Sequence, residues 1–403
     1  MRRVTCRVRP MRCAMAAMVL ALCATAPALA TEFIVDQAHA KADDANAGSA
    51  EAPLKTIAKG VSLAKAGDTV IVKAGTYGEA VTITAGGEAG KPITIKAAPG
   101  ERVVLTGAKR CGITWAAGVG YLVIDGFEFR DAGVFGNDFA VGSEGEGGHH
   151  VTIQNCVAVG CAMQLSKQSD CTIRRSIQTG SKRNGINLVG CKNCTVEECE
   201  IYDNGADGIT VSWGSDGCKV LRNYVHHMWY DSHPDGIQVY RKVTNFTVEG
   251  NLFFNVGQGF MLEETDGGVF RNNILAGTRH SGLVLGHKNT HNWTVEQNTI
   301  AYTSFKAIIF SGQNTVIRNN VVLCGGDNKL IQQAGQDPAS GDYNLLWKPE
   351  GVDVIYHMPK DQTPHSKFAD PKFRSAPPLN QKAIFYIDVW ANKGSDKLCT
   401  PSK

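Results

Sequence analysis

The sequence has no long apolar run after its first thirty residues and no marked excess of charge of either sign. A membrane-spanning helix needs about 20 mostly apolar residues, so we expect no membrane span beyond residue 30. The chain contains 41 basic and 38 acidic side chains, and five of the arginines lie within residues 1–30. The rest of the chain is therefore close to neutral, and a nucleic acid bound through a basic stripe is not expected.

The cysteine spacing is not that of a zinc site. Cys191 and Cys194 are closely spaced, but no second pair completes a set of four ligands. Cys171, Cys194 and Cys218 recur at the same place in successive repeats. They can be small buried side chains stacked in a core, or disulfides between neighbouring turns, since adjacent strands lie about 4.8 Å apart.

Residues 1–30 have the composition of a secretory signal peptide. Arginines precede an apolar run from Ala14 to Ala26, and Ala28-Leu29-Ala30 supplies the small residues of a cleavage site. The apolar run is too short to span a membrane. We therefore expect a secreted or periplasmic protein and exclude this segment from the fold.

From Val151 onward the sequence repeats every 20 to 28 residues. Periods of this length, with two or three short strands each, are typical of one β-helix turn per repeat. The asparagines of the repeat can form an internal ladder, because each side-chain amide both donates and accepts hydrogen bonds. The repeated position is occupied by Cys156, Ser176, Cys199, Asn223, Asn251, Asn273, Asn298 and Asn320.

A second repeated phrase begins at Gly185, Gly208, Gly236, Gly259 and Gly282 and reads GINL, GITV, GIQV, GFML and GLVL. Strand alternation directs the residue after each glycine inward and the next one outward. The outward positions, among them an exposed Thr210, are expected to form the outer face of a parallel sheet. The inward set is Ile186, Ile209, Ile237, Phe260 and Leu283, and the outward set is Asn187, Thr210, Gln238, Met261 and Val284.

Residues 54–64 carry apolar side chains at helical spacing and precede a strand at 69–72. A helix there can cover the open end of a coil. This stretch, with GDTVIVKAGTYGEAVTI and GKPITIKAAPGERVVLTG, resembles the opening of secreted bacterial right-handed parallel β-helix proteins of the pectate lyase-like superfamily. The resemblance implies the same coil, which some polysaccharide lyases and glycosidases share.

The predicted fold class is therefore all-β, a right-handed parallel β-helix with an N-terminal capping helix. The expected organisation is a signal peptide at 1–30, the cap and first turns at 31–110, the repeating β-helix at 111–345 and an irregular tail at 346–403.

The turn that holds Asn223 is the longest of the set, and its additional residues lie between His227 and Asp235. Loops are where function concentrates. His233 stands between Asp231 and Asp235, and an imidazole between two carboxylates has little structural purpose. His226 and His227 follow a strand, where we expect them to be simply exposed; contact with a substrate is the alternative.

In the β-helix lyases that the coil resembles, the substrate cleft lies on the outer face of one sheet. The resemblance implies a cleft here around the GIQV strand, with Asp207 and Asp235 at strand starts. Glu263 and Glu264 should point opposite ways unless the backbone bulges. The candidate side chains at the strand ends are Tyr240, Glu263, Trp213, Arg241, Glu264, His287 and Lys288.

Lysis or epimerisation of a uronate removes the proton beside its carboxylate, so the site must neutralise that carboxylate and supply a base. Arg241 is one candidate cation. Another is Ca²⁺ held by oxygens of Asp207, Asp235 and Glu263.

The candidate bases are His233, Lys242 and Lys288, with Asp231 and Asp235 beside His233. A second possible centre contains Glu263, His287 and Lys288. The phrase SHPDG resembles the Asp-Pro-His-Asp motif of mannuronan epimerases, but the residue order differs and no catalytic role is carried over.

The function expected first is a lyase or epimerase that acts on an acidic polysaccharide. A glycoside hydrolase with Asp207 and Asp235 as paired carboxylates is the alternative. A non-catalytic glycan-binding protein is the third reading. An enzyme should lose function when the loop charges are removed, whereas a binding protein should tolerate their loss.

Overall fold

The structure, a computed structural model, describes residues 30–106, 112–130, 139–143, 145–228, 234–287, 289–324, 330–334, 339–347 and 364–371. The predicted signal peptide lies almost wholly outside these ranges, as do Asp231, His233 and Lys288. No helix in the described ranges is long and apolar enough to cross a membrane.

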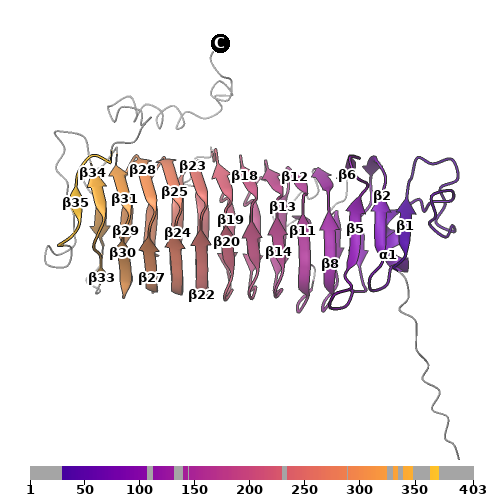
Figure 1. Ribbon diagram of the computed structural model, residues 1–403, viewed down its shortest axis with the longest axis horizontal. Helices are drawn as coiled ribbons and strands as arrows, with labels where there is room; N and C mark the ends of the chain where they lie inside the picture. The colour runs from indigo at the N-terminus through magenta and orange to yellow at the C-terminus, as the bar shows by residue number, and fades with distance from the viewer. Residues whose placement is uncertain are drawn as a thin grey trace, which may run out of the picture. The chain divides into compact units, whose positions relative to one another are not determined.

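The strands stack along one axis, and each strand pairs in parallel with the equivalent strands of the turns before and after it (Figure 1). A typical turn has three strands, one in each of three faces that we number in chain order. Strand β16 lies in face 1, β17 in face 2 and β18 in face 3, and β19 returns to face 1. The predicted right-handed parallel β-helix is confirmed.

Face 1 carries the GIQV strand and its neighbours. Its strands are β4 (Val81–Ile83), β7 (Ile113–Trp115), β10 (Phe139–Ser143), β13 (Ala162–Ser166), β16 (Ile186–Val189), β19 (Ile209–Ser212), the starts of β22 (Asp235–Glu249) and β24 (Gln258–Arg271), β26 (Leu283–His287), β29 (Ile308–Phe310) and β32 (Ile331–Gln333).

Face 2 joins face 1 into a single 22-stranded sheet, because β22 and β24 run through the corner between them. Its other strands are β1 (Glu32–Val35), β2 (Thr69–Val72), β5 (Ile93–Ala97), β8 (Gly120–Asp125), β11 (His149–Gln154), β14 (Thr172–Arg174), β17 (Thr195–Glu197), β20 (Lys219–Leu221), β27 (His291–Glu296), β30 (Thr315–Arg318) and β33 (Ala339–Ser340).

Face 3 is a separate 13-stranded sheet. It contains β3 (Gly75–Tyr77), β6 (Val103–Thr106), β9 (Phe127–Arg130), β12 (Val157–Val159), β15 (Ile177–Thr179), β18 (Glu200–Tyr202), β21 (Tyr224–His226), β23 (Leu252–Val256), β25 (Ile274–Thr278), β28 (Thr299–Thr303), β31 (Val321–Cys324), β34 (Leu345–Trp347) and β35 (Lys367–Phe368).

A short helix, α1 (Ile57–Leu63), lies where helical spacing predicts one. The Thr56 hydroxyl caps its first turn by accepting the Lys59 N–H. Gly60 faces Val35 and Val70 so closely that a β-carbon there would lie 2.8 Å from Val70. The helix thus packs on the first strands, and its role as a cap stays a prediction.

The inward and outward positions of face 1 follow the predicted alternation. Ile186, Ile209, Ile237 and Phe260 are fully buried. Thr210 differs from the expectation, since it points outward but is only 2% exposed. Its hydroxyl donates a hydrogen bond of 2.6 Å to Asn187 Oδ1 in the preceding turn, and neighbouring side chains cover it.

The asparagine ladder is confirmed. Asn251 Oδ1 accepts both the backbone N–H and the side-chain amide of Asn223, at 2.8 and 3.0 Å. Asn251 makes the same two bonds to Asn273 Oδ1, and its amide also reaches Val220 O. The ladder continues past residue 345, because Asn344 N–H donates to Ser366 Oγ.

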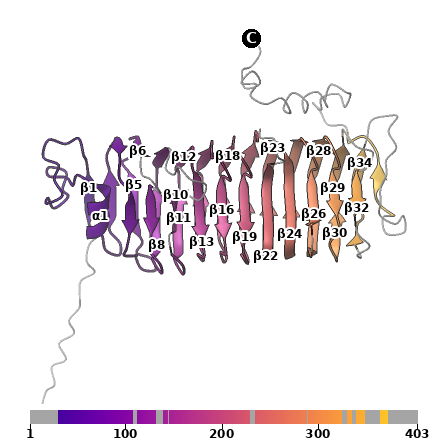
Figure 2. The ribbon, with the colours of Figure 1, turned by 180° about the vertical axis from the view of Figure 1, so that it is seen from behind.

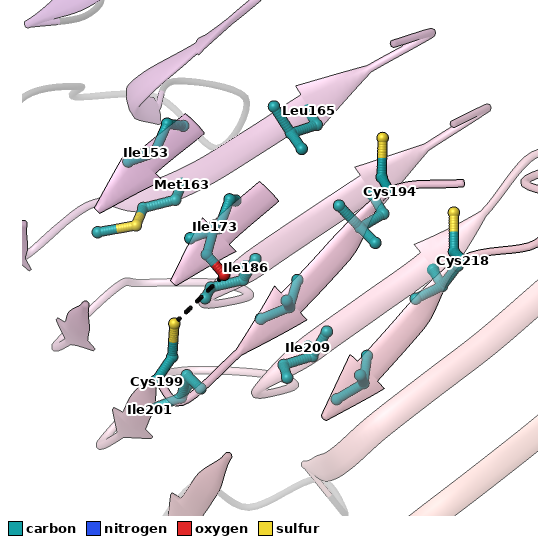
Figure 3. Close-up of a cluster of buried hydrophobic side chains, with 14 of the residues drawn as sticks. Ile153, Met163, Leu165, Ile173, Ile186, Cys194, Cys199, Ile201, Ile209 and Cys218 are labelled. Atoms are coloured by element: carbon teal, nitrogen blue, oxygen red, sulfur yellow. Dashed lines mark hydrogen bonds between the residues drawn. The ribbon is translucent and has the colours of Figure 1, made fainter. Parts of the chain in front are cut away.

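Seven described cysteines are buried and free, which supports the reading as core side chains for this part of the chain. Except for Cys171, their thiols contact backbone carbonyls of the preceding turn, as Cys199 does with Ile173 O at 3.7 Å (Figure 3). Figure 3 also shows Cys194 and Cys218 with sulfur atoms pointing the same way. Burial raises the pKa of Cys199 and of Cys218 to about 12, so these thiols stay protonated at neutral pH.

Candidate functional site

The strand-start carboxylates of face 1 take part in a hydrogen-bonded column along the stack. Asp207 Oδ1 accepts the Asp235 N–H at 2.9 Å, and Asn184 Oδ1 accepts the Asp207 N–H at 3.3 Å. Asp235 is only 1% exposed. The arrangement gives Asp207 a structural role, because its side chain positions the backbone of the next strand.

The strand ends of face 1 align a second set of residues in one row. Figure 2 shows β19, β22, β24 and β26 side by side in this order. Tyr240 pairs in register with Glu263, and Glu263 pairs with His287 across a register shift. Tyr240 and Glu263 point outward and are half-buried. Two residues of the predicted second centre, Glu263 and His287, therefore occupy paired backbone positions, whereas Lys288 lies outside the described residues.

The corner after Tyr240 contains one residue more than the corner after Glu263. Val243 pairs with Thr265, so Arg241 and Lys242 lie opposite Glu264 alone. Both have left-handed backbone conformations, with φ of 65° and 64°. Among the described residues they are the only two consecutive non-glycine residues with positive φ. Each such residue costs of order 1–3 kcal/mol, and strain of this kind clusters at functional sites.

Glu264 also has a left-handed conformation, with φ of 53°. The backbone turns at this residue, so the strict alternation of a strand ends at Glu263. Both glutamates are half-buried. Glu263 and Glu264 were expected to point opposite ways unless the backbone departs from regular strand geometry, and at Glu264 it does depart from it.

Arg241 stacks on aromatic rings of two adjacent turns. Its Cζ lies 4.0 Å from the centroid of Trp213 and 5.5 Å from that of Tyr240. Trp213 is 58% exposed, one of the most exposed large apolar side chains described. The repeat places Trp213 and Arg241 in the same column, but the stacking itself depends on the rotamers and on the register between turns.

The three carboxylates predicted to hold calcium do not form one group. Asp235 is at the start of its strand, and Glu263 is level with Tyr240, five residues further along. At about 3.3 Å per residue this separates them by roughly 16 Å, well beyond the 2.3–2.6 Å reach of a shared ion. In the described part of the chain no three His, Cys, Asp or Glu side chains gather as metal ligands. The three-residue site is thus corrected, and calcium itself stays a prediction.

His226 and His227 are not exposed on face 1, contrary to the expectation. His226 lies on face 3, is 8% exposed, and stacks between Tyr202 and Tyr224. Its Nε2 is 3.2 Å from Glu200 Oε1, and its Nδ1 is 2.6 Å from Nδ1 of His227. Burial lowers the pKa of His226 and of His227, so both rings favour the neutral form.

The comparisons with known proteins agree with the observed β-helix fold. The family model "Right handed beta helix region" matches residues 144–322. The protein YwoF of Bacillus subtilis is 41% identical over 64 residues, which is 16% of this chain and 14% of that protein. The chain therefore matches only a small part of this curated relative.

Three solved structures share the fold at low identity. XylC in its complex with xylose has a TM-score of 0.67 at 13% identity, covering 85% of this chain and 87% of that one. The A-module of mannuronan C-5 epimerase AlgE4 from Azotobacter vinelandii has 0.56 at 16%, covering 75% and 91%. Pectate lyase Pel9A has 0.51 at 17%, covering 77% and 79%. At these identities the likeness shows the fold alone.

Proposed function

The chain is a right-handed parallel β-helix with the fold that pectate lyase and the alginate epimerase share, and from this fold we propose a secreted enzyme that acts on a polysaccharide at face 1. The first choice of reaction is lysis or epimerisation of a uronate sugar. The observation that supports it is the register of Tyr240, Glu263 and His287, which occupy paired backbone positions at the ends of adjacent strands, with the side chains of Tyr240 and Glu263 directed outward.

The row contains candidates for two of the groups that this chemistry needs, the base and the acid. A base takes the proton from the carbon beside the carboxylate, and the electron pair then forms a C=C bond as the glycosidic C–O bond breaks. The imidazole of His287 is the proposed base, since imidazole is the side chain that titrates near neutral pH. Glu263 is the proposed group that orients it. Tyr240 is the proposed acid that protonates the departing oxygen or, in epimerisation, returns a proton to the opposite side of the sugar.

The geometry favours this chemistry over hydrolysis by Asp207 and Asp235. A hydrolase needs two carboxyl groups that reach the bond from either side. Asp235 is 1% exposed, and one oxygen of Asp207 is bonded to the Asp235 N–H. The loop residues Asp231 and His233 lie outside the described residues, so the centre predicted there stays a prediction.

The test is turnover on alginate, pectin and glycosaminoglycans, followed by three readouts. Ultraviolet absorbance reports unsaturated product, reducing ends report hydrolysis, and deuterium uptake from D₂O at the carbon beside the carboxylate reports epimerisation. We expect His287→Ala to lower the rate by about 10² to 10⁴. The control is His150→Ala, because His150 is an exposed histidine on face 2.

Equal activity of His287→Ala and wild type would overturn the proposed base. If His233→Ala is inactive while His287→Ala is active, the centre lies in the loop. Reducing ends without unsaturated product would favour the hydrolase. Binding without turnover on any of these polymers would favour the glycan-binding protein.

A further inference from the structure

The environment of Arg241 differs from that of the arginines at the corner between faces 2 and 3. Three of those side chains pair with glutamates of the preceding turn: Arg222 with Glu197 at 2.6 Å, Arg271 with Glu249 at 2.8 Å and Arg318 with Glu296 at 2.8 Å. Arg174 and Arg175 donate to Gln154 instead. Arg241 is exposed, and no ion pair between described residues includes it. Its guanidinium instead lies against the rings of Trp213 and Tyr240.

Stacking leaves the edge of the guanidinium as its binding surface. A guanidinium donates no hydrogen bonds toward a ring face that lies against it, because its N–H donors lie in its own plane. A carboxylate matches two of these donors at once, whereas a neutral sugar hydroxyl does not. A side chain held by two rings also loses less conformational entropy on binding than a mobile one.

The corner that carries Arg241 has a strained backbone. Two consecutive turns have one residue more here than their neighbours: Ile209 to Lys219 and Ile237 to Thr247 each span ten positions, whereas Ile186 to Thr195 and Phe260 to Val269 span nine. In the first of the longer corners the second left-handed residue is Gly214, which adopts it freely. In the second longer corner this residue is Lys242, a non-glycine residue for which the left-handed conformation is strained.

We propose that Trp213, Tyr240 and Arg241 form a subsite that binds the carboxylate of a uronate sugar, which makes an acidic polysaccharide the substrate class of face 1. The inference rests on the proposed function, because it extends the same face. Arg241 stacks toward the Trp213 turn, whereas Glu263 and His287 lie in the two turns that follow Tyr240. The bound carboxylate therefore belongs to a sugar next to the reacting one, and the exposed part of the Trp213 ring is available to its apolar side.

The test measures binding apart from turnover. The probes are oligogalacturonate and oligomannuronate, each beside the same oligomer with methyl-esterified carboxyl groups, titrated calorimetrically at fixed salt. We expect the acid form to bind and Arg241→Gln to weaken that binding about 10- to 100-fold, as for loss of a charge-assisted bidentate pair. Arg241→Lys should recover little of it, since lysine lacks the planar fork. Trp213→Ala should also weaken it.

Two control variants match these changes. Lys219→Gln removes one exposed positive charge from face 2, and Tyr343→Ala removes an aromatic ring that is also 58% exposed. Both should bind as wild type does. Circular dichroism and a melting curve for every variant establish that it is folded.

The subsite is overturned if neither acid form binds, if the methyl esters bind as tightly as the acids, or if Arg241→Gln binds no worse than Lys219→Gln. Its failure is distinct from failure of the proposed reaction. A protein that binds oligouronate through Arg241 but turns nothing over keeps the subsite and loses the enzyme. His287→Ala should keep the affinity while losing turnover.

Discussion

Replacing Asn251 with leucine tests the internal ladder on which the stack depends. The side chain is 1% exposed and leucine has the same branched shape with larger end groups, so the change removes hydrogen bonds without opening a cavity. Asn251 Oδ1 accepts from the backbone and side chain of Asn223, and its amide donates to Val220 O, Glu249 O and Asn273 Oδ1.

The expected loss follows from the groups left without these bonds. The buried backbone N–H of Asn223 loses its acceptor, whereas the carbonyl of Val220 loses the amide but stays in the parallel ladder with β22. A buried unsatisfied group costs about 1–3 kcal/mol, so Asn251→Leu should lower the free energy of unfolding by about 1–3 kcal/mol. Other groups that bond to the Asn251 side chain keep a partner. The Asn223 amide still donates to Val196 O, and Asn273 Oδ1 still accepts the backbone N–H of residue 251.

Urea unfolding followed by circular dichroism measures this loss as a lower midpoint. The control is Leu252→Ala at the adjacent position, which is 38% exposed and should change the free energy by no more than about 0.5 kcal/mol. A loss below 1 kcal/mol for Asn251→Leu, or equal losses for the two variants, would refute the argument that the ladder satisfies buried backbone groups.

Three further changes test other parts of the structure by the same unfolding measurement. Lys242→Gly should raise the free energy of unfolding by about 1 kcal/mol, because glycine adopts φ of 64° without strain; a loss would contradict the strain. Thr210→Ala should lower it by about 1 kcal/mol through the bond to Asn187, and a neutral result would mean that the bond contributes nothing. Because burial lowers the pKa of His226 and His227, the unfolded chain binds more protons near and below pH 6.5, so stability should fall from pH 7 to pH 5 and fall less in His226→Phe; equal slopes would contradict this.

The repeating part of the fold could be predicted from the sequence because every turn restates the same signal. The Asn223 to Asn320 column and the inward position of Ile237 each recur several times, so one irregular turn does not hide the pattern. The rungs at Asn344 and Ser366 were missed, since the apolar pattern around them weakens. Their spacing of 24 and 22 residues from the previous rung was the available signal.

The site could be predicted less well because it depends on contacts between turns. Strand alternation correctly directs His226 outward, but its burial comes from Tyr202 one turn away and Tyr224 two residues before it. The carboxylates grouped as a calcium site lie at opposite ends of their strands, and the five residues from Asp235 to Tyr240 were the available signal for that separation. The stack of Arg241 on Trp213 likewise requires the register between two turns.

The additional residues of the coil lie on both edges of the same part of face 1. Ile209 pairs with Ile237 and Tyr224 with Leu252, so the lengthening of the Asn223 turn falls between β21 and β22, at the strand starts. The longer corners fall at the strand ends of β19 and β22. Faces 2 and 3 keep their register through these turns, as Lys219 with Thr247 shows. Insertions that leave the stack unchanged and flank one stretch of one face are what a substrate-binding surface requires, since the scaffold stays rigid while the rims of the surface change.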